Sequence, residues 1–180
     1  FYNNQTNLVD TDGIHYMGYS LGGIYGPALV ALSPGIDRGV FWVGGSSFST
    51  MIERSTHYYQ FELVFSHSVS YPQRIDRAIL ISVAQQLWDS TDPETYLPFI
   101  ANGYEGVLGP NQVLMIDSVN DAQVSMLSSD RAGRTAGVPI LSTSSRIPYG
   151  IVVAGGPVDG SAMVYFDGHF PGVPDGNLPP

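Results

Sequence analysis

The stretch Gly18-Tyr19-Ser20-Leu21-Gly22-Gly23 constrains the fold of this chain more than any other stretch. It joins an apolar run, Ile14 to Met17, to a second apolar run of helical length, Ile24 to Leu32. We therefore expect a strand, a sharp turn with Ser20 at its apex, and a helix. Such a turn strains the backbone of the apical residue, and the flanking glycines let strand and helix approach closely.

The helix after this turn would direct its unpaired N–H groups and its partial positive charge toward Ser20. An oxyanion forming there could be bound by these groups, beginning with the N–H of Leu21. A serine at such an apex is suited to nucleophilic attack if a base and an acid lie near it. Because a glycine–serine turn before a helix is often only a cap, the rest of the chain must supply these partners.

Composition restricts the class of protein. The chain has 180 residues, of which 43% are hydrophobic and 13% charged, which is typical of one globular domain. The net charge is −9 and every basic residue is an arginine, so we expect neither nucleic acids nor anionic membranes as partners. No apolar run is long enough for a membrane span. The compartment stays open between a secreted and a cytoplasmic bacterial protein.

Metal and cofactor chemistry has no support in the sequence. The absence of cysteine excludes disulfides, thiolate nucleophiles and cysteine-ligated metals. No two histidines have metal-ligand spacing with a carboxylate nearby. We therefore expect neither a metal nor a cofactor.

The order of apolar runs and turns predicts an α/β fold. Ser33-Pro34-Gly35 ends the first helix and the buried run Val40 to Val43 follows, which makes a strand–helix–strand unit of a parallel sheet. We expect a mostly parallel sheet of about four or five strands with helices on its faces. The expected strands are residues 14–18, 40–43, 112–116, 138–141 and 162–166.

Residues 51–100 have a mostly helical pattern, and Asp92-Pro93-Glu94 marks a helix start within them. The aromatic part from His57 to His67 is either a lid over a pocket or, as we favour, packing between helices. We interpret residues 1–180 as a single domain, with an N-terminal arm at 1–12 and an extended proline- and glycine-rich tail at 171–180.

Two later residues complete a serine–acid–histidine set in that order along the chain. Asp121 lies in the loop after the third strand, and His169 is the only histidine that directly follows a strand, the last one. A histidine near Ser20 can take its proton, and a carboxylate can hold the tautomer of that histidine.

Three other aspartates compete with Asp121 for the role of the acid. Asp117 is nearer the end of its strand and would cap it, and Asp92 suits a helix cap. Asp167 stands two residues before His169 and suits a turn. We prefer Asp121, which lies farther beyond the strand.

Several segments of this chain resemble α/β-hydrolases of the bacterial esterase/lipase type. The resemblance covers about residues 14–169. Met17–Gly23 is similar to the G-x-S-x-G elbow of this family. Asn120–Val124, with Asp130-Arg131 and Arg134–Pro139, is similar to the acid loop and the helix that follows it. Asp89–Pro93 resembles a passage from helix to loop in the same family.

This resemblance implies a serine hydrolase that cleaves small or short-acyl carboxylic esters through an acyl-enzyme. Ser20 would be the nucleophile, His169 the base, Asp121 the acid and the N–H of Leu21 an oxyanion donor, with no cofactor. A peptidase or an acyltransferase would use the same triad. The alternative is a non-catalytic half-fold that serves binding or assembly.

Two departures from the family pattern carry consequences. Four strands normally precede the elbow, whereas about a dozen residues precede Ile14 here, and the helix after the histidine is missing. The chain thus resembles a C-terminal half, as a truncated member or a fragment of a longer chain. The first strand would be an exposed apolar edge that the N-terminal arm, a partner chain or both must cover, and we expect a homodimer or larger even oligomer. The second oxyanion donor is unassigned.

Overall fold

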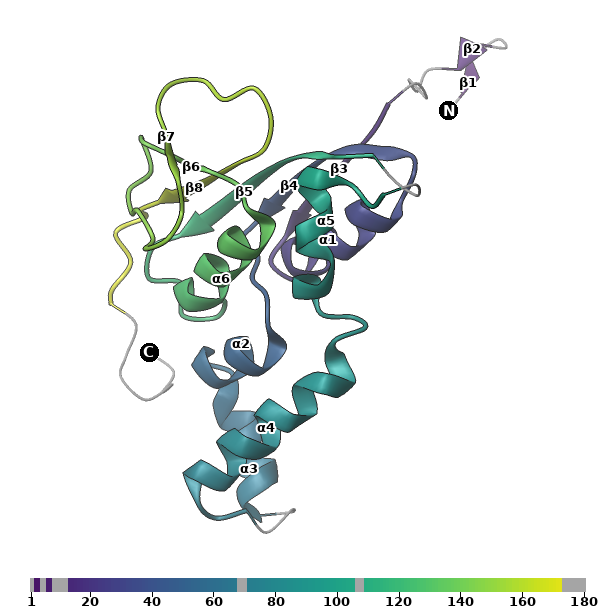
Figure 1. The fold of residues 1–180 in the computed structure, drawn as a ribbon. Helices are drawn as coiled ribbons and strands as arrows, with labels where there is room; N and C mark the ends of the chain where they lie inside the picture. Colours follow the sequence, from purple (N-terminus) through teal and green to yellow (C-terminus); the bar gives the residue numbers. More distant parts are fainter. Residues whose placement is uncertain (1, 4–5, 8–12, 68–70, 106–108, 173–180) are drawn as a thin grey trace.

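The computed structural model describes residues 2–3, 6–7, 13–67, 71–105 and 109–172. The larger of its sheets has the strand order β3-β4-β5-β8-β6-β7, and all its pairs are parallel (Figure 1). These strands are β3 (Ile14–Tyr19), β4 (Ile36–Trp42), β5 (Gln112–Ser118), β6 (Ile140–Leu141), β7 (Val153–Ala154) and β8 (Ala162–Phe166). The predicted parallel α/β sheet is confirmed. It has more strands than expected because the two-residue strand β7 adds a pair to β6.

The helices of the described residues are α1 (Leu21–Leu32), α2 (Phe48–Arg54), α3 (Tyr58–His67), α4 (Arg74–Trp88), α5 (Pro93–Asn102) and α6 (Met126–Ala136). Among these residues, α1 lies between β3 and β4, a group of four helices (α2 to α5) lies between β4 and β5, and α6 lies between β5 and β6. In the N-terminal arm, β1 (Tyr2–Asn3) and β2 (Thr6–Asn7) pair antiparallel. Most of the expected arm, 1–12, and tail, 171–180, lies outside the described residues.

The core lies on one face of the sheet. Three of the described helices cover this face: α5 lies between α1 and α6 and contacts both. The buried cluster there joins all three helices to β4, β5 and β8, and includes Val30, Phe41, Leu97, Ile100, Val113, Met115, Ala132, Met163 and Tyr165.

The opposite face of the sheet is apolar but less covered. The side chains that alternate with the core set are only partly buried at Trp42, Ile116 and Phe166, and those of Met17 and Tyr19 are 65% and 66% exposed. Parallel sheets normally have both faces buried. This face therefore has room for a further covering element.

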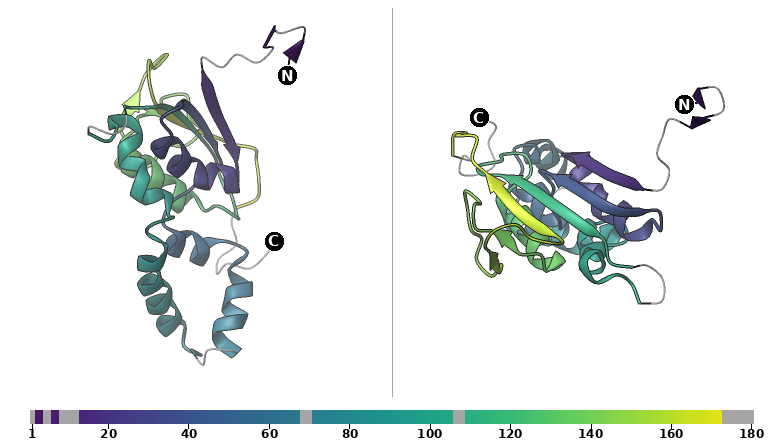
Figure 2. Two further views of the ribbon diagram at one scale, coloured as in Figure 1. Left: turned by 90° about the vertical axis from the view of Figure 1, so that its right-hand side faces the viewer. Right: turned by 90° about the horizontal axis from the view of Figure 1, so that it is seen from above.

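Helices α2, α3 and α4 form a separate group that extends away from the sheet (Figures 1 and 2). Asp92 fixes its junction with the sheet: this fully buried carboxylate accepts hydrogen bonds from the N–H groups of Ser47, Phe48 and Glu94 and from Gln85 Nε2. It therefore caps α5, as the sequence predicted, and also binds the start of α2. Within the described residues, no helix is both long and apolar enough to span a membrane.

Candidate active site

The turn between β3 and α1 has the strain that the sequence predicted. Ser20 has φ 53° and ψ −114°, which is a sparsely populated conformation for a non-glycine residue. Its N–H donates to Trp42 O at 2.9 Å, and its carbonyl accepts the N–H of Ile24 at 2.9 Å. The neighbouring strand and the helix thus hold Ser20 in this conformation from both sides.

Close backbone contacts explain the glycines at two of the three positions in this turn. A Cβ at Gly18 would lie 2.3 Å from Gly22 O, and one at Gly23 would lie 2.5 Å from Trp42 O. A Cβ at Gly22 would meet only the hydroxyl of Tyr16, at 3.4 Å. The steric requirement for glycine therefore falls on Gly18 and Gly23.

The hydroxyl of Ser20 is available for chemistry. It makes no capping hydrogen bond to α1, and no hydrogen bond joins it to any other described residue. The N–H of Leu21 opens α1, where an N–H group has no partner within the helix. The second oxyanion donor stays unassigned among the described residues.

Asp121 lies in a tight turn of the loop after β5. Its Oδ1 accepts the N–H groups of Gln123 and Val124 at 2.8 and 2.9 Å. The N–H of Thr56 holds the same loop through Ala122 O at 2.8 Å. Among the described residues no donor occupies Oδ2, so this oxygen is available to a further partner.

Asp117 is in a different environment, although it is only four residues away. It is 1% exposed, and neither carboxylate oxygen has a hydrogen-bond partner among the described residues. Burial raises the pKa of Asp117 to about 8; the nearby Ser129 hydroxyl and Gly44 backbone offset part of the rise, and the negative charges of Asp121 and Asp130 add to it. At neutral pH the group is therefore mostly protonated, which makes it a poor partner for an imidazolium ion.

His169 follows β8, as predicted, but its side chain points into solvent. The imidazole is 90% exposed, and its Nδ1 lies 3.6 Å from Asp167 Oδ2. The backbone N–H of His169 donates to Asp167 Oδ1 at 2.7 Å, and the φ of His169 is 57°. Within the described part of the chain, no hydrogen bond or ion pair joins His169 to Ser20 or to Asp121. Asp167 is a turn residue here, as the sequence suggested.

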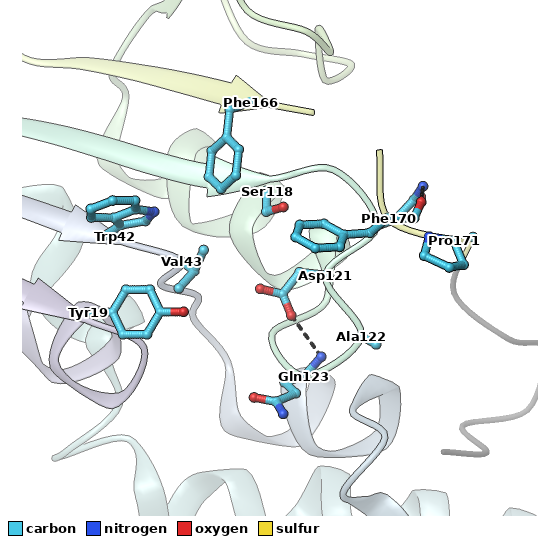
Figure 3. A pocket seen from close by; sticks show the side chains of 12 residues that line it. Tyr19, Trp42, Val43, Ser118, Asp121, Ala122, Gln123, Phe166, Phe170 and Pro171 are labelled. Carbon is cyan, nitrogen blue, oxygen red and sulfur yellow. Dashed lines mark hydrogen bonds between the residues drawn. The ribbon is translucent and has the colours of Figure 1, made fainter. Parts of the chain in front are cut away.

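A cavity of about 470 Å³ lies at the carboxyl ends of β3, β4, β5 and β8 (Figure 3). Aromatic side chains dominate its walls, and Asp121 is its charged group. It extends from Tyr19, next to Ser20, to Phe170, next to His169. The lining residues are Tyr19, Trp42, Val43, Ser118, Asn120, Asp121, Ala122, Gln123, Phe166, Phe170, Pro171 and Gly172. None of them belongs to α3.

No family model matches the sequence, and no curated protein sequence matches it either. Solved structures do match the fold. The acylaminoacyl peptidase of Pyrococcus horikoshii aligns with 89% of this chain at a TM-score of 0.51 and 16% identity. Acetyl xylan esterase 1 from Thermoanaerobacterium sp. JW/SL YS485 aligns with 91% of it at a TM-score of 0.52 and 16% identity.

The fold of this chain matches part of the α/β-hydrolase fold. The chain spans 21% of the length of the peptidase and 42% of the length of the esterase. The turn that the sequence predicted as an elbow lies between β3 and α1, and the loops after β5 and β8 carry the predicted acid and histidine.

The fold brings together some of the predicted residues. Ser20, Leu21 and Asp121 follow the carboxyl ends of β3 and β5, on the same side of the sheet. His169 follows the carboxyl end of β8 on that side, but its imidazole faces solvent. Among the described residues no group of histidines and carboxylates has the arrangement of a metal site. Sequence reasoning missed the pairing of Arg146 with Asp130 behind the acid loop, and no short motif around Arg146 could have indicated it.

Proposed function

We propose that this protein is a serine hydrolase that cleaves carboxylic esters through an acyl-enzyme. The observation that carries the proposal is the strained, hydrogen-bonded Ser20 at the start of α1, with its hydroxyl unpaired. Strain of this kind persists where the surroundings hold it and is concentrated at functional sites. The structural neighbours named as a peptidase and an esterase support hydrolysis as the general class.

The chemistry assigns one role to each residue. Ser20 Oγ attacks the ester carbonyl carbon while its proton passes to His169, and the N–H of Leu21 binds the oxyanion. The alcohol leaves with the proton from His169, which gives the acyl-enzyme. Water then attacks the acyl carbon, and Ser20 regains its proton as the acid is released. Asp121 Oδ2 would accept the imidazole N–H and hold its tautomer.

This mechanism requires His169 to turn toward the cavity. Phe170, the next residue, already lines the cavity together with Asp121, and the peptide oxygen of Phe170 accepts a hydrogen bond from Asn120 Nδ2 at 3.2 Å. The segment that carries His169 is thus bound to the acid loop. A rotation of the exposed backbone at Gly168 and His169 would move the imidazole from solvent into the cavity.

The proposed substrate is a small or short-acyl ester. The cavity beside Tyr19 is apolar and has a volume of about 470 Å³, within the usual range for small-molecule sites. Its aromatic walls suit a short acyl chain or a small alcohol.

The direct test is covalent labelling with a fluorophosphonate, which reacts with an activated serine. We expect Ser20 to be labelled and a short-acyl chromogenic ester to be hydrolysed. Ser20→Ala should abolish both while the circular dichroism spectrum stays unchanged, because the substitution removes one unpaired hydroxyl. Ser142→Ala, at an exposed serine whose side chain makes no hydrogen bond to a described residue, is the matched control.

Near-wild-type turnover by Ser20→Ala would contradict the proposal. Hydrolysis of amides, or transfer to an acyl acceptor, by the same serine would reassign the protein to the peptidases or acyltransferases. A panel of ester, amide and acceptor substrates separates these three activities.

A non-catalytic half-fold is the second candidate, and the exposed imidazole of His169 favours it. A site in which the base never reaches the serine would leave Ser20 unactivated. The protein would then neither react with the fluorophosphonate nor hydrolyse any ester of the panel, although it would remain folded.

We also propose that a second copy of the chain covers the outer edge of β3 and the outer face of α1. The side chains of Leu21, Tyr25, Leu29 and Leu32 on α1 are 45–63% exposed, and Met17 on β3 is 65% exposed. An apolar edge strand with unpaired backbone groups is a template for association, and two-fold pairing is the commonest closed arrangement.

Light scattering across a dilution series tests this assembly. We expect a dimer, or a larger even oligomer, that Leu29→Asp converts to a smaller species. A monomer that remains folded and active at nanomolar concentration would contradict a second copy as the cover.

A further inference from the structure

A bidentate ion pair lies behind the acid loop. Arg146 Nη1 and Nη2 donate to the two carboxylate oxygens of Asp130 at 2.5 and 2.7 Å. Asp130, on α6, is only 8% exposed, and the Arg146 guanidinium lies 5.0 Å from the centre of the Tyr165 ring. Pairs with this geometry are directionally specific as well as strong.

Tyr165 and Ser144 close this group into a ring of hydrogen bonds. The buried Tyr165 hydroxyl donates to Asp130 Oδ1 at 2.7 Å. The N–H of Tyr165 donates to Ser144 Oγ at 2.7 Å, and Ser144 Oγ donates to Arg146 O at 2.9 Å. We call Asp130, Ser144, Arg146 and Tyr165 the Arg146 cluster.

The Arg146 cluster joins the two elements that carry the proposed acid and base. The acid loop, residues 119–125, ends where α6 begins, and the Tyr165 hydroxyl also lies 3.2 Å from the carbonyl of Met126, the first residue of α6. The base segment, residues 167–172, begins two residues after Tyr165. A direct bond from Val119 N–H to Phe166 O, 2.9 Å, joins the same two elements.

We infer that the Arg146 cluster positions the acid loop relative to the base segment, and so sets the geometry in which Asp121 can orient His169. This inference rests on the proposed function. Arg146, Asp130 and Tyr165 are then positioning residues that act through Asp121 and touch no substrate. A pair retained only for stability would have no special relation to Asp121.

Two members of the Arg146 cluster, the Tyr165 phenol and the Arg146 guanidinium, hold their protons firmly. Burial raises the pKa of the Tyr165 phenol, and the hydrogen bond to Asp130 raises the pKa of Arg146. The phenol therefore stays protonated and the guanidinium stays charged. A positioning device of this kind acts equally in the acidic and the alkaline parts of a pH–rate profile.

Tyr165→Phe tests the inference with the smallest change, because it removes one hydroxyl and leaves the ring under Arg146. We expect kcat for a short-acyl ester to fall about tenfold, the order of one lost positioning hydrogen bond, with KM little changed. Arg131→Gln is the matched control, since Arg131 lies on the same helix and pairs with Glu94 on α5 at 2.6 Å. It should leave kcat unchanged.

A double-mutant cycle identifies the route of the effect. In an Asp121→Asn background, Tyr165→Phe should cause no further loss, because the group that the cluster positions is already disabled. An equal loss in both backgrounds would overturn the inference.

Hydrogen exchange supplies a readout that needs no turnover. Tyr165→Phe should speed exchange of the amides in residues 119–125 and 167–172 and leave α1 and α5 unchanged. The inference would be overturned if exchange became faster throughout the chain, or if the exchange rates did not change in either segment. If Ser20→Ala kept full activity, the proposed function would fail, whereas the exchange result would still decide whether the cluster couples the two loops.

Discussion

Ser20 and His169 both have a positive φ, 53° and 57°, yet the fold holds them in different ways. Hydrogen bonds to β4 and α1 fix the backbone of Ser20, and close approaches at Gly18 and Gly23 leave no room for larger side chains there. The backbone N–H of His169 donates to Asp167 Oδ1, two residues before it, and the His169 imidazole is 90% exposed. One end of the proposed triad is determined by sheet packing and the other by a local turn.

The two ends of the proposed triad therefore differ in how far the fold positions them in advance. A nucleophile at a strand–helix turn is positioned by the same contacts that build the sheet, so its geometry is present without a ligand. A base on an exposed segment takes its place only when the surroundings favour it. The following predictions test how unequal the two ends are.

The largest effect should come from Asp121, which stands between the two ends. Asp121→Asn should lower kcat by about 10⁴-fold, the magnitude known for a triad acid in serine proteases. The amide keeps the acceptor for Gln123 and Val124 but cannot hold the imidazole tautomer. Steady-state kinetics with a short-acyl ester measures this. Asp117→Asn is the control and should keep turnover near wild type; the reverse result would transfer the role to Asp117.

Asp117 should instead control stability. Its pKa of about 8 in the folded protein lies above its value in the unfolded chain, so the folded state keeps a proton that the unfolded state releases. The free energy of unfolding should therefore fall as pH rises from about 4 to about 8. Asp117→Asn should remove this fall and stabilise the protein at pH 8 by several kcal/mol, since each pKa unit is worth about 1.4 kcal/mol.

Urea denaturation at pH 5 and at pH 8 measures this difference. The gain of Asp117→Asn over wild type should be larger at pH 8. An equal gain at both pH values would mean that Asp117 ionises in the fold as it does in the unfolded chain.

A smaller effect on stability should distinguish the glycines of the serine end. Gly23→Ala should destabilise the protein by about 1–3 kcal/mol and impair the elbow, because the added methyl meets backbone that is part of β4. Gly22→Ala should be tolerated, since its methyl meets only the Tyr16 hydroxyl at 3.4 Å. Thermal unfolding of both variants checks the contrast, and equal destabilisation would refute the steric explanation.

The sequence predicted well where backbone sterics decide the structure. The strained Ser20, the parallel sheet and the cap at Asp92 each follow from short-range patterns of glycine, apolar runs or aspartate before proline. These features depend on neighbours in the chain and on the period of the strands. They therefore leave a signature in a few consecutive residues.

Side-chain partners that are distant in the sequence left no such signature. Arg146 pairs with Asp130 across sixteen residues, and Tyr165 reaches the same carboxylate from thirty-five residues away. The orientation of His169 was equally unpredictable, because an exposed side chain on a loop is placed by contacts outside its own segment. The position of His169 after the last strand was predicted, and the solvent-facing imidazole was not.

The smallest effect should come from the turn at the histidine end. Among the described residues, Asp167 is the carboxylate that lies within ion-pair distance of the His169 imidazole, at 3.6 Å, so it is the rival to Asp121 as the acid. Asp167→Asn keeps a side-chain oxygen that can accept the backbone N–H of His169, and it removes only the negative charge. If Asp121 is the acid, kcat should stay within about threefold of wild type, as expected for an exposed pair of low energy. Steady-state kinetics of this variant beside Asp121→Asn decides the question. A loss as large as that of Asp121→Asn would show that His169 works where it now stands, paired with Asp167, and that Ser20 must approach it by another route.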